Sequence, residues 1–289
     1  MTLYNTNHFM QKSFLSLLIT LLFSFSIKAQ VAPQPSPGAS FSQTIGVTRV
    51  DVEYSRPGVK GRDIFGGLLK YGELWRTGAN APTVISFSND VKINGATLFA
   101  GDYSLHSFPD EKEWKIVFNT DLTATQNTYN ELDNALLISV ESRKIDFTET
   151  FTIDISDVQA DMAQLNIYWE QTAVSIQIEV DNEAAIYNEI QIRNNEAAGA
   201  FQQAAEYMVN KQMDLAKALE NIEKSIFLKE TFRNTWIKSV ILRQMGRNTE
   251  ALEMATKAQK LGGTDPVYQL FKAAVESSIL ELRSSVPAN

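Results

Sequence analysis

The apolar residues of this chain recur with two different periods, one in each half. Between residues 41 and 180, short segments alternate apolar and polar residues; in "VTRVDVEY", for example, Val50, Val52 and Tyr54 fall on one face. About nine or ten such segments, rich in β-branched and aromatic residues, follow one another with no helical stretch between them. This pattern predicts an antiparallel β-sandwich.

Turn-forming residues separate the predicted strands. Asn94–Gly95 stands between two apolar runs, which is a strong signal for a two-residue hairpin, and "FPDEKEW" indicates a second turn. The segment before the first strand, residues 30–40, is rich in proline, serine and glycine, so we expect a flexible lead-in there.

A helical period begins at Asp181, which suits a helix N-cap, and the alanine-rich stretch behind it contains no proline. Gly246 and Gly262 are expected to end two later helices, and Pro266 to begin the last. The helices expected after the first one cover residues 213–229, 232–245, 249–261 and 266–283. Residues 181–289 are therefore predicted to form an all-α domain, which makes the chain an α+β protein of two domains.

The helical half contains an internal repeat. Three positions recur at an offset of 33 residues with the same internal spacing: Ala218, Ile222 and Ser225 match Ala251, Ala255 and Ala258. The stretch "QMGRNTEALEMATKAQKLGG" resembles the second helix of a tetratricopeptide repeat, in which small residues let paired helices approach closely. We predict about two degenerate repeats and a capping helix; a plain bundle of helical hairpins is the alternative.

The N-terminus predicts export. An apolar run of 14 residues, "FLSLLITLLFSFSI", ends in "KAQ" and follows a start with one cation and no acid. A run this short with a small residue at its end is typical of a secretory signal peptide, here residues 1–29, cleaved near Ala29. A membrane anchor is the alternative, but it needs about 20 apolar residues. We therefore expect a periplasmic or secreted protein with no membrane span after cleavage.

The composition excludes several kinds of site. The chain has no cysteine and two histidines, and His106 is the only one beyond the signal peptide. A thiol nucleophile, a cysteine-bound metal and a histidine-rich metal site are therefore excluded, and we expect no cofactor and no metal. The net charge of −8 argues against nucleic acid as a partner. His106, in "DYSLHSF", is expected to be a half-exposed strand residue rather than a catalytic base.

One segment of the acidic β half is basic. Residues 49–76 hold six basic and four acidic residues, whereas residues 77–180 hold five basic and 16 acidic ones. The same segment contains the dense run "YSRPGVKGRDIFGGLLKYGELWRTGAN", which begins at Tyr54. If the β half has a site, we expect it there.

That run, together with "AGDYSLHSFP", "EWKIVFN" and "IYWEQTAVSIQIEV", resembles the bacterial family known as domain of unknown function 2911. The resemblance covers about residues 34–180. It implies a secreted or periplasmic protein of Bacteroidetes-like bacteria, in which the domain often stands beside helical repeats. It implies no reaction and supplies no functional residue.

The basic segment can be interpreted in two ways. As a ligand site it would use arginine forks for a carboxylate, phosphate or sulfate, aromatic faces for a sugar ring, an amide, and glycines that allow close approach. The alternative is structural: the arginines pair with the domain's carboxylates, the glycines make turns and the tryptophan belongs to the core. The candidate ligand-binding residues are Tyr54, Arg56, Arg62, Trp75, Arg76 and Asn80.

These observations lead to two main hypotheses. The first is an exported, non-catalytic protein whose β domain binds a small anionic or sugar-like ligand or an envelope protein, while the helical repeats bind a protein partner. The second is a glycan-acting hydrolase that uses an Asp/Glu pair near the loop of residues 56–76. A third possibility is that the β domain is only a structural unit packed on the helices.

Overall fold

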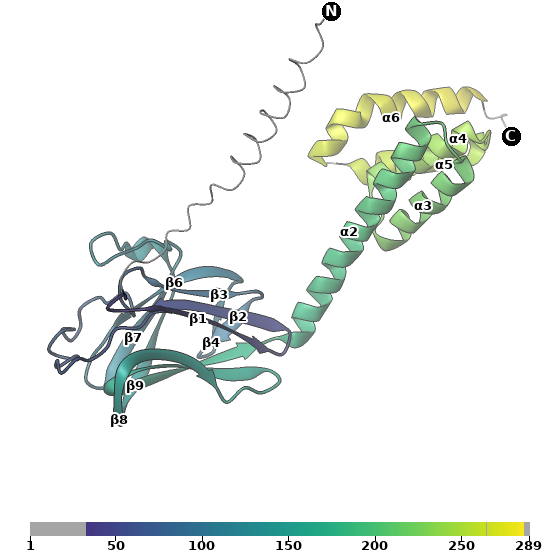
Figure 1. Ribbon diagram of the computed structural model, residues 1–289. Coiled ribbons are helices and arrows are strands. Elements are labelled where there is room, and N and C mark those ends of the chain that lie inside the picture. The colour runs from purple at the N-terminus through teal and green to yellow at the C-terminus, as the bar shows by residue number, and fades with distance from the viewer. Residues whose placement is uncertain (1–32, 264, 286–289) are drawn as a thin grey trace, which may run out of the picture.

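The computed structural model describes residues 33–263 and 265–285, which form a strand part and a helical part (Figure 1). The strands are β1 (Gly38–Ile45), β2 (Thr48–Ser55), β3 (Thr83–Phe87), β4 (Val91–Ile93), β5 (Ala96–Leu98), β6 (Gly101–Phe108), β7 (Glu113–Asn119), β8 (Asn134–Ser156) and β9 (Met162–Val180). The helices are α2 (Asn182–Asn210), α3 (Leu215–Leu228), α4 (Phe232–Gln244), α5 (Asn248–Gly262) and α6 (Pro266–Ser285). The α+β layout is confirmed; β1 begins inside the segment expected to be a lead-in.

The strands form one continuous antiparallel sheet in the order β1-β2-β3-β6-β7-β8-β9-β4-β5. Long strand β8 connects its two halves: residues 134–141 pair with β7, and residues 142–156 pair with β9. Register shifts interrupt the β8–β9 pairing between Lys144 and Thr152, and Glu170 on β9 has a positive φ of 55°. Such irregularities bend strands without ending them, so segments expected to be separate strands are fused here.

The sheet is bent so that its halves face each other. Strands β2 and β8 are not neighbours in the sheet, yet the Tyr54 hydroxyl of β2 donates a hydrogen bond to the Ile153 carbonyl of β8 at 3.1 Å. The alternating apolar residues of both halves fill one core between them. The predicted sandwich is therefore two layers of a single sheet rather than two separate sheets.

The predicted hairpin at Asn94–Gly95 is confirmed. It joins β4 to β5, and its two residues have φ angles of 46° and 83°. Positive φ at both central positions defines the type I′ turn, which asparagine and glycine tolerate best.

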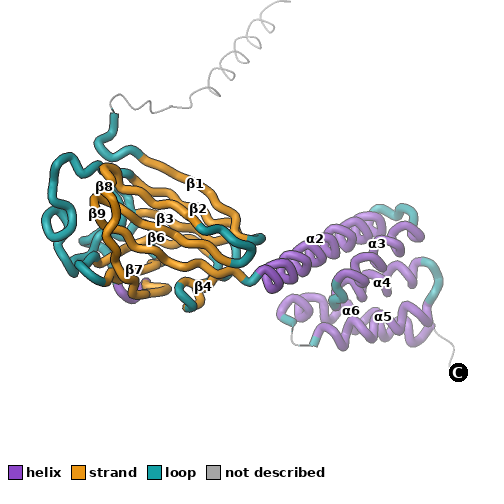
Figure 2. The backbone as a smooth tube through the Cα atoms, turned by 90° about the horizontal axis from the view of Figure 1, so that it is seen from below, coloured by secondary structure: helices purple, strands orange, loops and turns teal. Residues whose placement is uncertain are grey.

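Helix α2 leads from the sheet into the helical part, which stands beside the strand part in Figure 2. The Asp181 side chain accepts a hydrogen bond from the Ala184 amide, as expected of an N-cap. Helix α2 packs on α3, α4 packs on α5, and α6 follows on α5. All six predicted repeat positions are fully buried: Ala218, Ile222, Ser225, Ala251, Ala255 and Ala258. That these hairpins are tetratricopeptide repeats stays a prediction.

Two further predictions concern the N-terminus and the membrane. The predicted signal peptide, residues 1–29, lies outside the described residues. Within residues 33–263 and 265–285, no helix combines the length and apolar character needed to cross a membrane.

Candidate functional site

The loop between β2 and β3, residues 56–82, is tied to both layers of the sheet. Gly58 forms an antiparallel bridge with Thr150 of β8, and Trp75 forms one with Ser107 of β6. The second bridge consists of two backbone hydrogen bonds of 2.8 Å. Because backbone pairs fix the loop at both ends, its side chains have defined positions over the end of the sheet.

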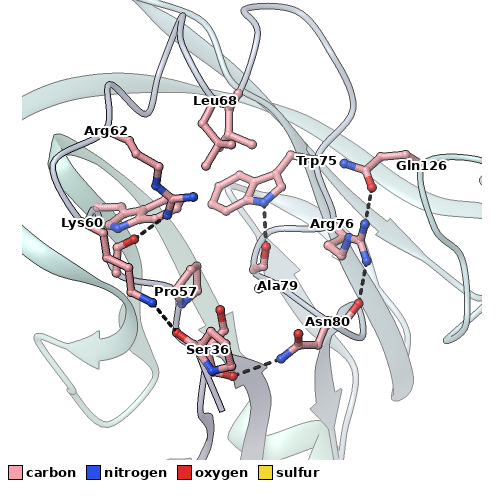
Figure 3. A pocket seen from close by; sticks show the side chains of 15 residues that line it. Ser36, Pro57, Lys60, Arg62, Leu68, Trp75, Arg76, Ala79, Asn80 and Gln126 are labelled. Carbon is pink, nitrogen blue, oxygen red and sulfur yellow. Dashed lines mark hydrogen bonds between the residues drawn. The ribbon is translucent and has the colours of Figure 1, made fainter. Parts of the chain in front are cut away.

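A cavity of about 400 Å³ opens among these side chains (Figure 3). Four of the predicted residues line it, namely Arg62, Trp75, Arg76 and Asn80. Tyr54 and Arg56 are not part of its lining. The structure thus gathers most of the predicted set around one hollow and separates two members from it.

Tyr54 belongs to the core. Its residue surface is 6% exposed, and its ring meets Phe151 edge-on with the centroids 5.8 Å apart. Its hydroxyl donates to the Ile153 carbonyl and accepts from the Ile153 amide at 3.2 Å. No face of this ring is open to a ligand, so the sequence prediction for Tyr54 is wrong.

Arg56 holds the loop to β8. Its Nε donates to the Phe151 carbonyl at 3.2 Å, and Nη2 donates to Thr152 Oγ1 at 2.7 Å. Both acceptors belong to the strand opposite β2. This arginine therefore has the structural role that the sequence left as an alternative, although its partners are neutral oxygens rather than carboxylates.

Trp75 forms the inner wall of the cavity rather than an open stacking platform. The residue is 3% exposed, and its ring is stacked on Trp169 with an interplanar angle of 21° and a centroid distance of 6.0 Å. Its Nε1 donates to the Gly78 carbonyl at 2.8 Å. The aromatic cluster uses most of the ring surface, so the expectation that a sugar could stack on this face is not met.

The glycines mainly allow the loop to turn. Gly66 has φ +87°, and a Cβ there would lie 2.8 Å from the Tyr71 ring. Gly78 has φ +156°, and a Cβ there would lie 3.0 Å from Thr83 Oγ1. Side chains are disfavoured at both positions, which is the structural explanation of glycine in this run.

Three cations line the cavity, and their hydrogen bonds go to neutral oxygens. Arg62 donates from Nε to the Val59 carbonyl at 3.0 Å and from Nη2 to the Gly58 carbonyl at 2.7 Å. Arg76 donates to the Asn80 carbonyl and to Gln126 Oε1, both at 2.6 Å. The Lys60 ammonium donates to the Pro35 carbonyl at 3.2 Å.

The cations of this cavity form no ion pairs, although the Glu149 carboxylate lies next to the loop and accepts a hydrogen bond from the Lys60 amide at 3.0 Å. Among the described residues, no carboxylate oxygen lies within 4.0 Å of the charged nitrogens of Lys60, Arg62 or Arg76. The lining contains neither Asp nor Glu. The structural alternative, in which these arginines neutralise the domain's carboxylates, is therefore wrong for the two that line the cavity.

The amide of Asn80 fastens the segment in front of β1. Its Nδ2 donates to the Ser36 carbonyl at 3.0 Å and to Ser55 Oγ at 3.3 Å. Together with the bond from Lys60 to Pro35, this places the segment as one wall of the cavity. Asn80 itself has φ +60°, a conformation that asparagine adopts more readily than most residues.

Sequence reasoning missed three polar residues of the lining, Ser36, Lys60 and Gln126. Lys60 stood in the basic segment, so its charge was a usable signal. Gln126 lies 50 positions beyond its partner Arg76, in the loop between β7 and β8, and nothing in its surroundings marks it. Only the three-dimensional arrangement of the two loops brings it to the site.

His106 is fully buried, so the expectation of a half-exposed residue is wrong. The loop after β7 covers it: its Nε2 lies 3.2 Å from the Ala124 carbonyl, and its ring packs 5.3 Å from that of Tyr129. Because a carbonyl only accepts, Nε2 carries the hydrogen. Burial lowers the pKa of His106 below its usual value, while hydrogen bonds to Ala124 and Ser104 oppose this shift.

Comparison with known proteins identifies the strand part. Residues 36–178 match the family model described as protein of unknown function (DUF2911). The β domain belongs to this family. No curated protein and no solved structure matches the chain. The resemblance noted in the sequence is thereby confirmed for the DUF2911 domain, which contains every lining residue of the cavity except Pro35.

The remaining predictions are outside this match. The family match ends at residue 178, before α2, so a protein partner for the helices stays a prediction.

Over the part of the chain that the structure describes, no group of three or more His, Asp or Glu side chains is arranged to hold a metal ion.

Proposed function

We propose that the DUF2911 domain of this chain is a non-catalytic binding domain that takes a small anionic or sugar-acid-like ligand in the loop cavity. The observation that carries this proposal is the charge of the lining: Lys60, Arg62 and Arg76 surround a hollow without any carboxylate. In a half-enclosed space a cation without an ion-pair partner is screened less than on open surface, so an anion bound there gains more from each contact.

The cavity favours binding over the hydrolase alternative. Glycoside hydrolysis needs two carboxyl groups about 5–9.5 Å apart on either side of the scissile bond. Because the lining holds neither Asp nor Glu, the cavity supplies no such pair. The cavity volume is within the range of about 300–1,000 Å³ that is usual for small-molecule sites.

The proposal includes a location outside the cytoplasm. The signal-like N-terminus favours a protein that works in the periplasm or outside the cell, where it would meet free anionic metabolites or envelope components. We propose this location on the sequence alone.

A thermal-shift experiment on the chain from Gln30 tests the proposal. Phosphate, sulfate and gluconate are compared with chloride at equal ionic strength, because sulfate and phosphate also stabilise proteins unspecifically by exclusion from their surface. The control variant is Lys115→Gln, which removes one exposed positive charge on β7 that is not part of the cavity lining.

The proposal predicts that at least one of these anions raises the melting temperature of the wild type and of Lys115→Gln by the same amount. The shift should fall to the chloride value in Arg62→Gln. Equal shifts in both variants, or no shift above chloride in any protein, would refute the proposed function.

A further inference from the structure

We infer that the ligand of the loop cavity carries two anionic groups, one at each end of a less polar body. This inference rests on the proposed function and adds the class of ligand to it. It comes from the arrangement of the three cations, which do not converge on one point.

The cations occupy opposite sides of the cavity. Figure 3 shows Lys60 and Arg62 on one side of the Trp75 ring, and Arg76 with its partner Gln126 on the other. The hydrogen bonds in each group are local: Arg62 is held by the carbonyls of residues 58 and 59, and Arg76 by that of Asn80. The two sides are thus separately built positive positions.

An apolar strip separates these two positions. Leu68, Trp75 and Ala79 lie between them in the lining (Figure 3). Of these, Leu68 is half exposed, so part of its apolar surface remains open. A ligand that spans the cavity must therefore place an aliphatic chain or the less polar face of a sugar in the middle, since charged groups there would lose hydration without a partner.

Both sides keep unused donors. Arg62 uses Nε and Nη2, and within the described residues Nη1 has no hydrogen-bond partner. The Lys60 ammonium makes one hydrogen bond and can make three. Arg76 uses one hydrogen on each terminal nitrogen, which leaves one on each.

A single anion can satisfy only one of these sides. It would leave the cations on the other side without an anion bound to them, whereas a dianion of suitable length would pair with both sides. Each charge-assisted contact is about twice as strong as a neutral hydrogen bond. We therefore expect a matched dianion to bind markedly more tightly than the monoanion with the same skeleton.

Three six-carbon compounds allow this comparison. Glucarate has a carboxylate at each end, gluconate has one, and glucitol has none, while the hydroxylated chain between the ends is common to all three. Isothermal titration calorimetry on the chain from Gln30 should give a dissociation constant for glucarate at least about tenfold below that for gluconate. Glucitol should show no measurable binding.

Two variants locate the ends. Arg76→Gln should reduce glucarate affinity to the level of gluconate and leave gluconate affinity nearly unchanged, because the better-supplied side, with Lys60 and Arg62, still binds one carboxylate. Arg62→Gln should weaken both acids. Lys115→Gln, the control, should alter neither, and circular dichroism checks that each variant is folded.

The outcomes separate this inference from the proposed function. Equal affinities for glucarate and gluconate in the wild type would overturn the dianion inference and leave anion binding intact. The same holds if phosphate or sulfate binds while both sugar acids fail. If none of these anions binds, both the inference and the proposed function are wrong.

Discussion

The two parts of this protein use their cations in different ways. In the helical part, seven of 13 basic residues form ion pairs with Asp or Glu: Arg193, Lys224, Arg233, Lys238, Arg243, Arg247 and Lys257. In the β domain only one of 11 does, Arg49 with Asp51. These counts refer to residues that the structure describes.

The part with the larger excess of acidic residues is the one in which fewer cations form ion pairs. The helical part has 14 acidic residues for its 13 basic ones, whereas the β domain has 20 for 11. Abundance therefore does not decide pairing. Helix surfaces bring opposite charges together at positions three or four apart and on adjacent helices, whereas the β2–β3 loop holds its arginines with carbonyl oxygens, which accept hydrogen bonds without cancelling charge.

The arginines of the β2–β3 loop can face the cavity only if the loop is held in place, and Trp75 holds it. Removing the Trp75 side chain should therefore have the largest effect on stability. Trp75→Ala should lower the free energy of unfolding by about 3–5 kcal/mol, because a buried tryptophan in an aromatic cluster leaves a large cavity. Denaturant unfolding followed by circular dichroism measures this loss. As a control, Phe147→Ala on β8, where the residue is 57% exposed, should change stability by less than about 0.5 kcal/mol.

The next largest loss of stability should distinguish Arg56, which holds the loop to β8, from Arg62, which lines the cavity. Arg56→Gln should cost about 1–3 kcal/mol, because it breaks the bonds to the Phe151 carbonyl and to Thr152 Oγ1 across the layers. If urea unfolding instead shows Arg62→Gln to be the more costly change, our division of the arginines into structural and ligand-binding groups is incorrect.

A smaller change in stability is expected when one arginine of the helical part and one of the cavity are each replaced by glutamine. Arg233→Gln in α4 should cost up to about 1 kcal/mol, because Arg233 makes two hydrogen bonds to Glu206 and lies over the Phe271 ring. Arg62→Gln should cost less still in ligand-free protein, most clearly at low salt, because reduced repulsion among like charges partly offsets the loss of its two hydrogen bonds within the loop. Urea unfolding at two salt concentrations measures both, and a larger loss for Arg62→Gln would contradict the account.

The smallest effect concerns pH. His106 is the only imidazole outside the predicted signal peptide, and burial holds its pKa below the usual 6.5. The unfolded chain therefore binds a proton more readily than the folded one below about pH 6.5, so this residue's contribution to stability is full above that pH and is lost on acidification. An NMR titration of the chain from Gln30 should place this pKa below 6.5; a higher value would be inconsistent with the buried position.

The sequence predicted the elements well because they depend on local chemistry. The Asn94–Gly95 turn, the Asp181 cap and the helix start at Pro266 all follow from the preferences of individual residues, and all three are found. The fusion of strands in β8 was missed because a bend at a register shift and the end of a strand look alike in a pattern of period two.

The candidate site was only partly predictable for a similar reason. Residue type identified the arginines, but whether an arginine holds the fold or faces a cavity depends on its acceptor. Arg56 meets carbonyl and hydroxyl oxygens of a strand 95 positions away, whereas Arg62 meets carbonyls within four positions. Tyr54 and Trp75 followed strand and loop patterns that do not reveal which face is covered by the opposite layer.

The most direct measurement follows the arginine Nε–H signals in an NMR titration of the chain from Gln30 with phosphate. The account predicts that the signal of Arg62 moves and reaches saturation first and that of Arg76 follows at higher phosphate concentration. The signals of Arg233 and Arg247, which are paired with carboxylates, should stay within the drift seen with chloride. If the four signals move alike, or if only the paired arginines respond, the cavity is not a special anion site and the central claim is wrong.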